Sequence, residues 1–315
     1  MSKPIVNLIG AGKMGRNWAS ALRDFEGLDY LEFSAISDAN PDVSYYVKSE
    51  HPERRFYEDV KEMIVKENPD GVIVAVPAGN HAKIIYGCVD AGCKKLLVEK
   101  PFVPLRKWKE GLEVMEYCSG RAEIMTGDII LYDPVMKSLM ENMNKIGSIQ
   151  SVVSYRINDY PWRMNDVDVI DDLAIHDFHG FRYMTGWPEV QIISSVHRSL
   201  MRENQKDYCS FRALSLDEVS FASTSAWIPG KHQMRLTYVR GSKTTAEMDY
   251  AAHRLQIKLE SEGKEIEEIP VPKEDALRNE LQEFVQFVST NAHPLSTASE
   301  EMKTLTQMKP ILSKD

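Results

Sequence analysis

Lys100 is the first of three side chains, from two segments distant in sequence, that could together perform acid–base chemistry on a hydroxyl group. It follows the apolar run 96–98 and precedes Pro101. Because proline lacks an N–H and disfavours helix in the residue before it, we expect a short buried strand that ends here. A cation at a strand's carboxyl end can hydrogen-bond a substrate oxygen or stabilise an alkoxide. The alternative is that Glu99 and Lys100 are solvated turn residues.

The other two side chains, Asp172 and His176, lie four residues apart in the segment 168–186, whose apolar residues recur at helical spacing. On a helix they share a face. A carboxylate beside an imidazole orients the ring and raises its proton affinity, which suits a general base near neutral pH. Asp171, Asp177 and His179 add polar groups nearby. The alternative is an acidic first turn on an ordinary helix with an incidental histidine.

A glycine-rich turn near the N-terminus supplies the context for this chemistry. Gly10, Gly12 and Gly15 follow the β-branched run 4–9 and open a segment with helical spacing of apolar residues. The three glycines suit a tight turn, close backbone approach to a pyrophosphate, and close helix packing on the strand. The helix N-terminus would then offer N–H groups to phosphates. The pattern predicts a dinucleotide-binding fold.

Asp38 ends the second predicted strand, 31–37, and lies 26 residues after Gly12. There a carboxylate accepts hydrogen bonds from the adenosine ribose and repels a 2′-phosphate. No Arg or Lys follows at positions 39–41. We therefore expect NAD as cofactor, with NADP less favoured. Alternatively, Asp38 only begins a turn.

Two domains are needed to position these residues. Strand and helix patterns alternate up to residue 126, with strands at 71–77, 96–98 and 122–126 and helices at 57–68, 81–91 and 105–118. This predicts an α/β domain, a Rossmann doubly wound parallel sheet, over residues 1–126. From residue 148, long runs alternate with period two, and a helix is expected at 275–291. Residues 127–315 are therefore predicted to form an α+β domain with a large, mostly antiparallel open sheet.

Composition narrows the class of partner. The 315 residues carry 38 basic and 47 acidic side chains, a formal charge of −9, without a long basic run. This argues against nucleic acid or an anionic membrane as partner. The sequence shows neither a transmembrane-length apolar segment nor a secretory signal, and its four cysteines have no zinc or disulfide spacing. We expect a cytoplasmic protein with a small-molecule substrate and no metal.

Taken together, these motifs resemble the glucose-fructose oxidoreductase, inositol 2-dehydrogenase and rhizopine-catabolism (Gfo/Idh/MocA) oxidoreductases. The matching elements, in order, are GAGKMG, Asp38, AVPAGNH, VEKPF, YDP before a helix, DLAIHD and ELQEFVQFV, covering residues 4 to about 305. The resemblance implies hydride transfer between NAD(P) and a secondary alcohol or ketone carbon of a sugar, sugar derivative or polyol. It also implies a homodimer or homotetramer formed through the C-terminal sheet.

The resemblance further implies a role for each matching position. The expected catalytic residues are Lys100, His176 and Asp172. Cofactor contacts are expected from Gly10, Gly12, Lys13, Met14, Gly15, Asp38, Pro77, Asn80, His81, Glu99 and Lys100. Substrate contacts are expected from Lys100, Arg163, Asp171, Asp172 and His176. His81 opens a helix after the third strand and is not expected to act as acid or base.

Within the family, residues 127–140 and 160–177 look most like the nucleotide-sugar 3-dehydrogenases. The chain departs from that branch at informative points: Asp128 replaces a common His, Leu131 a common Arg and Asp168 a common Gly, and Asp171 adds a carboxylate. Losing one arginine weakens the case for a diphosphate-linked substrate. The substrate is therefore placed only at the level of sugar or polyol.

Two other functions stay open. The first is a catalytically silent NAD(P)-sensing regulator or binding protein of the same fold, whose expected mark is loss of Lys100 or His176; both are present. The second is a reductase of an unrelated carbonyl, such as a dihydrodiol or tetrapyrrole, for which a more apolar pocket is expected.

Overall fold

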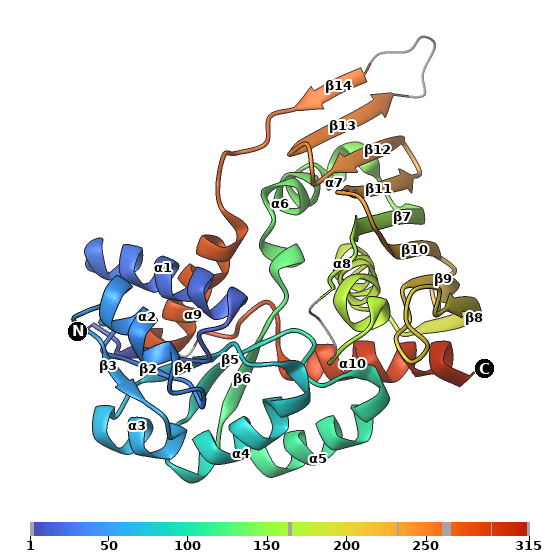
Figure 1. Cartoon of the computed structure of the whole chain (residues 1–315). Helices are drawn as coiled ribbons and strands as arrows, with labels where there is room; N and C mark the ends of the chain where they lie inside the picture. Colours follow the sequence, from blue (N-terminus) through green and yellow to red (C-terminus); the bar gives the residue numbers. More distant parts are fainter. Residues whose placement is uncertain (1–2, 163–165, 232, 260–265, 291, 314–315) are drawn as a thin grey trace. The chain divides into compact units, whose positions relative to one another are not determined.

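The computed structural model describes residues 3–162, 166–231, 233–259, 266–290 and 292–313, which form two compact units (Figure 1). The first unit comprises Met1–Gly127 with Leu277–Met302, and the second comprises Asp128–Ala276 with Lys303–Asp315. Each unit contains one β-sheet. The predicted fold class is confirmed: a parallel sheet with helices, followed by a mostly antiparallel sheet.

The sheet of the first unit has six strands, all paired in parallel. In spatial order they are β3 (Arg55–Tyr57), β2 (Ala35–Ser37), β1 (Val6–Ile9), β4 (Gly71–Val74), β5 (Lys95–Glu99) and β6 (Glu123–Gly127). Strands β1, β4 and β5 are buried throughout, as expected for a sheet covered on both faces. The strand order reverses between β1 and β4, which makes their carboxyl ends the expected ligand crevice.

Helices cover both faces of this sheet. They are α1 (Lys13–Gly27), α2 (Val43–Glu50), α3 (Val60–Glu67), η1 (Ala78–Asn80), α4 (His81–Asp90), η2 (Leu105–Lys107), α5 (Trp108–Cys118) and α9 (Ala276–Thr290). Helices α3, α4 and α5 follow one another on one face, and α1 and α9 lie on the other (Figure 1). The sequence prediction missed β3 and α2. It also began α3 too early, because Asp59 caps the helix by accepting from the Glu62 N–H at 2.7 Å.

Helix α9 corrects the predicted domain boundary, which assigned everything after residue 126 to the second domain. Residues 277–302 belong to the first unit. Phe284 and Val288 of α9 lie so close to Gly71 of β4 that a Cβ there would meet Val288 at 2.7 Å. Arg278 forms an ion pair with Asp24 of α1 at 2.7 Å. The chain therefore returns to cover the parallel sheet, a long-range contact that local patterns do not encode.

The second unit is built on a sheet of eight strands. In spatial order they are β14 (Ile266–Ile269), β13 (Arg254–Leu259), β12 (Thr244–Asp249), β11 (Met234–Gly241), β7 (Ile149–Asp159), β10 (Ser220–Ile228), β9 (Tyr208–Ser215) and β8 (Val190–Arg198). All neighbours pair antiparallel except β7 and β10, which are parallel. Strands β9 and β14 were not anticipated.

One face of this sheet is covered by helices. These are η3 (Ile129–Tyr132), α6 (Pro134–Glu141), α7 (Met143–Ile146), the π-helix η4 (Ile170–Ala174), α8 (Ile175–Met184) and η5 (Lys309–Ser313), with α10 (Ala298–Met308) near the C-terminus. Phe181 of α8 stacks on Phe221 of β10 with ring centroids 4.5 Å apart. The alternating burial along β9 and β10 follows from this one-sided cover.

Among the residues that the structure describes, none of the helices combines the length and apolar character needed to cross a lipid bilayer.

Candidate active site

The glycine turn between β1 and α1 has the geometry that a dinucleotide requires. Gly10 has φ +90°, and a Cβ there would lie 2.6 Å from the Ala75 carbonyl oxygen. A Cβ on Gly15 would lie 2.0 Å from the Gly10 carbonyl oxygen. By contrast, the space beside Gly12 is open, because no atom of the described residues lies within 4 Å of a Cβ placed there. Gly10 and Gly15 thus pack the turn, whereas Gly12 leaves room for a ligand.

The N-terminus of α1 is suited to an anion. Its N-cap residue is Gly12, no side chain in the described part of the chain caps it, and the first turn has no acidic residue. Lys13 is exposed and Met14 is half-buried in that turn. Because the first N–H groups of a helix have no partner within the helix and carry partial positive charge, they suit a pyrophosphate. The residues present therefore fit a dinucleotide.

Asp38 lies directly after β2, next to this turn. One carboxylate oxygen accepts a hydrogen bond from the Ala11 N–H at 2.8 Å, and the other accepts one from the Asn40 N–H at 2.9 Å. The side chain is half-buried. Both hydrogen bonds fix the carboxylate beside the glycine turn, and each oxygen keeps a lone pair for a ribose hydroxyl.

The residues after β4 that are predicted to contact the cofactor differ in their exposure. Pro77 and Asn80 are exposed. His81 has no exposed surface: one ring nitrogen lies 2.9 Å from the Val76 carbonyl oxygen, and the other lies 3.0 Å from that of Pro101. His81 thus joins the loop after β4 to the loop after β5, a role that the sequence did not suggest. A ring without exposed surface is not available to the nicotinamide. Of Asn80 and His81, only Asn80 therefore remains a candidate cofactor contact.

The carboxyl end of β5 holds Glu99 and Lys100 at the sheet edge, as predicted. Glu99 is buried and accepts a 2.6 Å hydrogen bond from the indole N–H of Trp18 on α1. Lys100 is half-buried, and the peptide bond to Pro101 is cis. The next N–H, of Phe102, donates to the buried Glu301 carboxylate at 2.6 Å. The loop that carries Lys100 is therefore fixed on both sides by buried hydrogen bonds.

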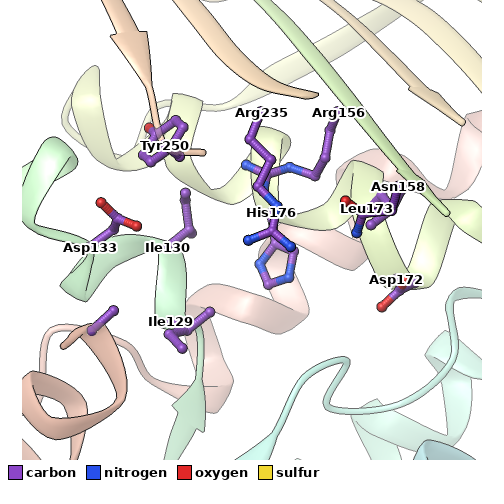
Figure 2. A pocket seen from close by; sticks show the side chains of 11 residues that line it. Ile129, Ile130, Asp133, Arg156, Asn158, Asp172, Leu173, His176, Arg235 and Tyr250 are labelled. Atoms are coloured by element: carbon purple, nitrogen blue, oxygen red, sulfur yellow. The ribbon is translucent and has the colours of Figure 1, made fainter. Parts of the chain in front are cut away.

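The second unit contains a cavity of about 320 Å³, a size typical of small-molecule sites (Figure 2). It lies between the covered face of the sheet and the helices η3, η4 and α8. Its lining residues are Ile129, Ile130, Asp133, Arg156, Asn158, Asp172, Leu173, His176, Arg235, Tyr250 and Ala276. Two predicted catalytic residues, Asp172 and His176, thus line one polar cavity.

The helix that carries these two residues differs from the predicted regular helix. Asp168 accepts from the Ile170 N–H at 3.0 Å and begins it, and residues 170–174 adopt the rare π conformation, which is frequent at functional sites. The wider turn changes the offset between Asp172 and His176. Asp172 accepts a hydrogen bond from the indole N–H of Trp227 on β10 at 3.2 Å. Asp171 is buried in the same turn, and orientation of His176 by Asp172 stays a prediction.

Two arginines that line this cavity were not predicted as site residues from the sequence. Arg156 on β7 and Arg235 on β11 are directly paired across the antiparallel ladder, and Figure 2 shows both side chains reaching from the sheet toward His176. Burial lowers the pKa of Arg235, and the neighbouring Arg156 guanidinium lowers it further. Period-two alternation could have placed both on the covered face, but only the pairing of β7 with β11 brings them together.

Buried ionic contacts hold α8 in place. Asp177 forms an ion pair with Arg156 at 2.8 Å and accepts from the Ser223 hydroxyl at 3.1 Å. Burial raises the pKa of Asp177, against the opposing effect of Arg156. His179 is fully buried, with one ring nitrogen 3.0 Å from the Thr304 hydroxyl and the other 3.4 Å from the Asp128 carboxylate. Asp177 and His179 therefore support the helix.

Three further expectations concern Arg163, the convergence of Lys100 and His176, and metal binding. Arg163 lies outside the described residues. Lys100 belongs to the first unit and His176 to the second, so their convergence on one substrate stays a prediction. Within the described ranges, no cluster of three or more His, Cys, Asp or Glu side chains is placed to hold a metal ion.

Comparison with known proteins identifies the fold of the first unit. Residues 5–126 match the model of an oxidoreductase family with an NAD-binding Rossmann fold. Two curated relatives are the myo-inositol 2-dehydrogenase of Thermotoga maritima and the rhizopine catabolism protein MocA of Rhizobium meliloti. The first is 25% identical over 58% of this chain and 54% of its own length, and the second 23% identical over 59% and 58%. The chain thus spans little more than half the length of the curated relatives it matches.

A solved structure is similar over the whole chain. It is UDP-N-acetylglucosamine 3-dehydrogenase GnnA from Acidithiobacillus ferrooxidans, with a TM-score of 0.85 and 19% sequence identity, covering 99% of this chain and 98% of that one. At this identity the likeness is one of fold. It extends through the eight-stranded sheet of the second unit, beyond the residues that the family model matches.

Proposed function

We propose that this chain, whose residues 5–126 match the Gfo/Idh/MocA oxidoreductase family model, is an NAD-dependent dehydrogenase or reductase acting on a CH–OH carbon of a sugar, sugar derivative or polyol. The observation that carries the proposal is the presence in one chain of a dinucleotide turn with open space at Gly12 and a polar cavity lined by His176. The names of the relatives, which include an inositol dehydrogenase and a nucleotide-sugar dehydrogenase, agree with it.

In this mechanism, the first unit would hold NAD, which would supply the acceptor for a hydride from the substrate carbon. His176 takes the hydroxyl proton as general base, a role that typically contributes about 10²- to 10⁴-fold to the rate. Lys100 hydrogen-bonds the same oxygen and stabilises the alkoxide as the proton leaves. Asp172, held by the Trp227 indole, supplies a negative charge on the cavity wall that favours the imidazolium formed.

The cofactor would be held by the first unit. The N–H groups at the start of α1 would bind the pyrophosphate, with Lys13 and Met14 flanking it, and Asp38 would bind the adenosine ribose. The fixed carboxylate of Asp38 would repel a 2′-phosphate, which favours NAD over NADP. Pro77, Asn80 and Glu99 follow or end strands at the same sheet edge and would contact the nicotinamide half.

The second sheet would form the contact between subunits. Its uncovered face carries partly exposed apolar side chains on four neighbouring strands: Tyr155, Leu214, Ile228 and Met234. Such a face in a monomer would leave apolar surface in contact with water. A homodimer or homotetramer built on this face follows from the proposal.

The rival function is a silent cofactor sensor, and it differs from an enzyme in one respect: NAD(H) binds but is not turned over. Both functions can be compared by following absorbance at 340 nm with NAD and a panel of sugars and polyols, and with NADH and the corresponding ketones. The enzyme predicts NADH formation that Lys100→Met lowers by about 10²-fold or more, while NADH affinity is kept.

Lys94→Met is the matched control, because Lys94 is exposed at the opposite, amino end of the same strand. It is expected to leave the rate unchanged. Full activity of Lys100→Met on a confirmed substrate would remove Lys100 from the mechanism. Tight NADH binding without turnover of any substrate would establish the sensor instead.

A further inference from the structure

Arg235 is a cation in the cavity wall that the proposed mechanism does not use. Its Nε is buried and has no hydrogen-bond partner among the described residues, and in that part of the chain no carboxylate forms an ion pair with its guanidinium. The residue lines the cavity, and Figure 2 shows its side chain extending from the sheet toward His176. Buried donors without partners cost free energy, so this arrangement is explained if a ligand supplies the acceptor.

The other charged groups of the cavity already have partners. Arg156 is paired with Asp177 at 2.8 Å. Asp133 accepts from the Val135 N–H at 2.8 Å and caps α6, and Asp172 accepts from Trp227 at 3.2 Å. Arg235 is thus the charged side chain of this wall for which the described residues provide no direct partner. It also stands opposite Arg156, a like-charge pair that an anion between the strands would relieve.

We propose that the substrate carries a carboxylate, as in an aldonic or uronic acid, and that Arg235 binds this group with help from Arg156. A guanidinium fork matches the two oxygens of a carboxylate. A phosphate dianion fits less well, because Asp133 and Asp172 line the same cavity and would repel its second charge. The cavity size suits a single acidic sugar. The inference rests on the proposed function for the identity of the cavity as substrate site.

The test compares pairs of ligands that differ only in the acid group. D-gluconate and D-glucuronate are matched with D-glucitol and D-glucose, and each is titrated into the NADH-bound protein by calorimetry. Because this measurement requires no turnover, it is independent of the dehydrogenase assay. Oxidation rates with NAD are then measured for the same compounds.

Three variants locate the effect. Arg235→Gln removes the charge and Arg235→Lys keeps it without the fork. The matched control is Arg240→Gln on the same strand, because Arg240 is exposed on the opposite face. Circular dichroism and the melting temperature show that each variant is folded.

The inference predicts that the acids bind at least about tenfold more tightly than their neutral partners. Arg235→Gln should remove that preference by raising KM and Kd for the acids much more than for the neutral sugars. Arg235→Lys should restore part of it, and Arg240→Gln should change nothing. Equal binding of acids and neutral sugars, or an equal loss of both in Arg235→Gln, would overturn the inference while leaving the dehydrogenase proposal in place. Binding of acids that depends on Arg235, without NADH formation, would support the inference and contradict the dehydrogenase.

Discussion

At the scale of single residues, the proposed function makes Asp38 the side chain that favours NAD over NADP. Its two carboxylate oxygens are fixed by the N–H groups of Ala11 and Asn40. We expect Asp38→Ala to weaken NADH binding by about tenfold, because ribose hydrogen bonds are lost, and to improve NADPH binding, because the repulsion is removed. Fluorescence titration with both cofactors measures the change in preference.

The control for this variant is Asp42→Ala, which removes one exposed negative charge from the same loop. It should leave the ratio of the two affinities near that of the parent protein. If Asp38→Ala keeps the parent preference, Asp38 is a turn residue and the choice of NAD over NADP has another cause.

We expect Trp227 to act on catalysis through Asp172. Its indole N–H donates to the Asp172 carboxylate at 3.2 Å, and the ring is buried. Trp227→Phe keeps most of the packing but removes the donor, so kcat should fall by about three- to tenfold, as for loss of one hydrogen bond, with a displaced acidic limb of the pH–rate profile.

Trp162→Phe is the corresponding control, because Trp162 is largely exposed. An unchanged kcat and pH profile in Trp227→Phe would show that this hydrogen bond only packs the helix against the sheet.

At the scale of elements, two glycines of the turn between β1 and α1 are expected to have different tasks. Gly15 allows close packing in the fold, and Gly12 leaves room for the cofactor. A Cβ on Gly15 would lie 2.0 Å from the Gly10 carbonyl oxygen, whereas a Cβ on Gly12 would meet no described atom within 4 Å. Gly15→Ala should therefore lower the free energy of unfolding by about 2 kcal/mol or more through overpacking. Gly12→Ala should keep the stability within about 0.5 kcal/mol but weaken NADH binding.

Urea denaturation and NADH titration measure the two effects. Gly79→Ala is the control, because a Cβ at Gly79 also meets no atom within 4 Å among the residues that the structure describes. Equal loss of stability in the Gly12 and Gly15 variants would contradict the assignment of their separate tasks.

Elements with strong periodic patterns were predictable from the sequence, and those defined by distant contacts were not. The buried strands of the first unit and the alternating strands β7, β10 and β11 carry their pattern locally. Strand β3 has three residues, too few for a periodic signal. The π-helix of residues 170–174 has the same spacing of apolar residues as an α-helix, so its wider turn is not visible in the sequence.

The same distinction between local patterns and distant contacts applies to the candidate site. Lys100, Asp172 and His176 stand in recognisable motifs, whereas the Arg156–Arg235 pair depends on the register of β7 with β11. His81 was assigned to the cofactor because its motif follows a strand. Its burial between two loop carbonyls is a tertiary contact that no local pattern reveals.

At the scale of the whole molecule, the uncovered face of the eight-stranded sheet predicts self-association. Tyr155 lies on the central strand β7 and is 40% exposed, and its register partners are Leu236 and Thr224. We expect Tyr155→Glu to convert the oligomer into single chains, because a buried unpaired charge would destabilise the contact. Light scattering after size-exclusion chromatography gives the mass.

Tyr45→Glu, at an exposed tyrosine of α2, is the control and should keep the parent mass. A parent protein with the mass of one chain at all concentrations would refute association through this face.

The proposed mechanism requires Lys100 and His176 to act on the same substrate oxygen beside the cofactor. The most direct measurement is a crystal structure with NAD and a substrate analogue. We expect the substrate carbon to lie about 3–3.5 Å from the nicotinamide C4, with its oxygen about 3 Å from both the Lys100 Nζ and an imidazole nitrogen of His176. A nicotinamide with either side chain outside contact range of that oxygen would contradict it.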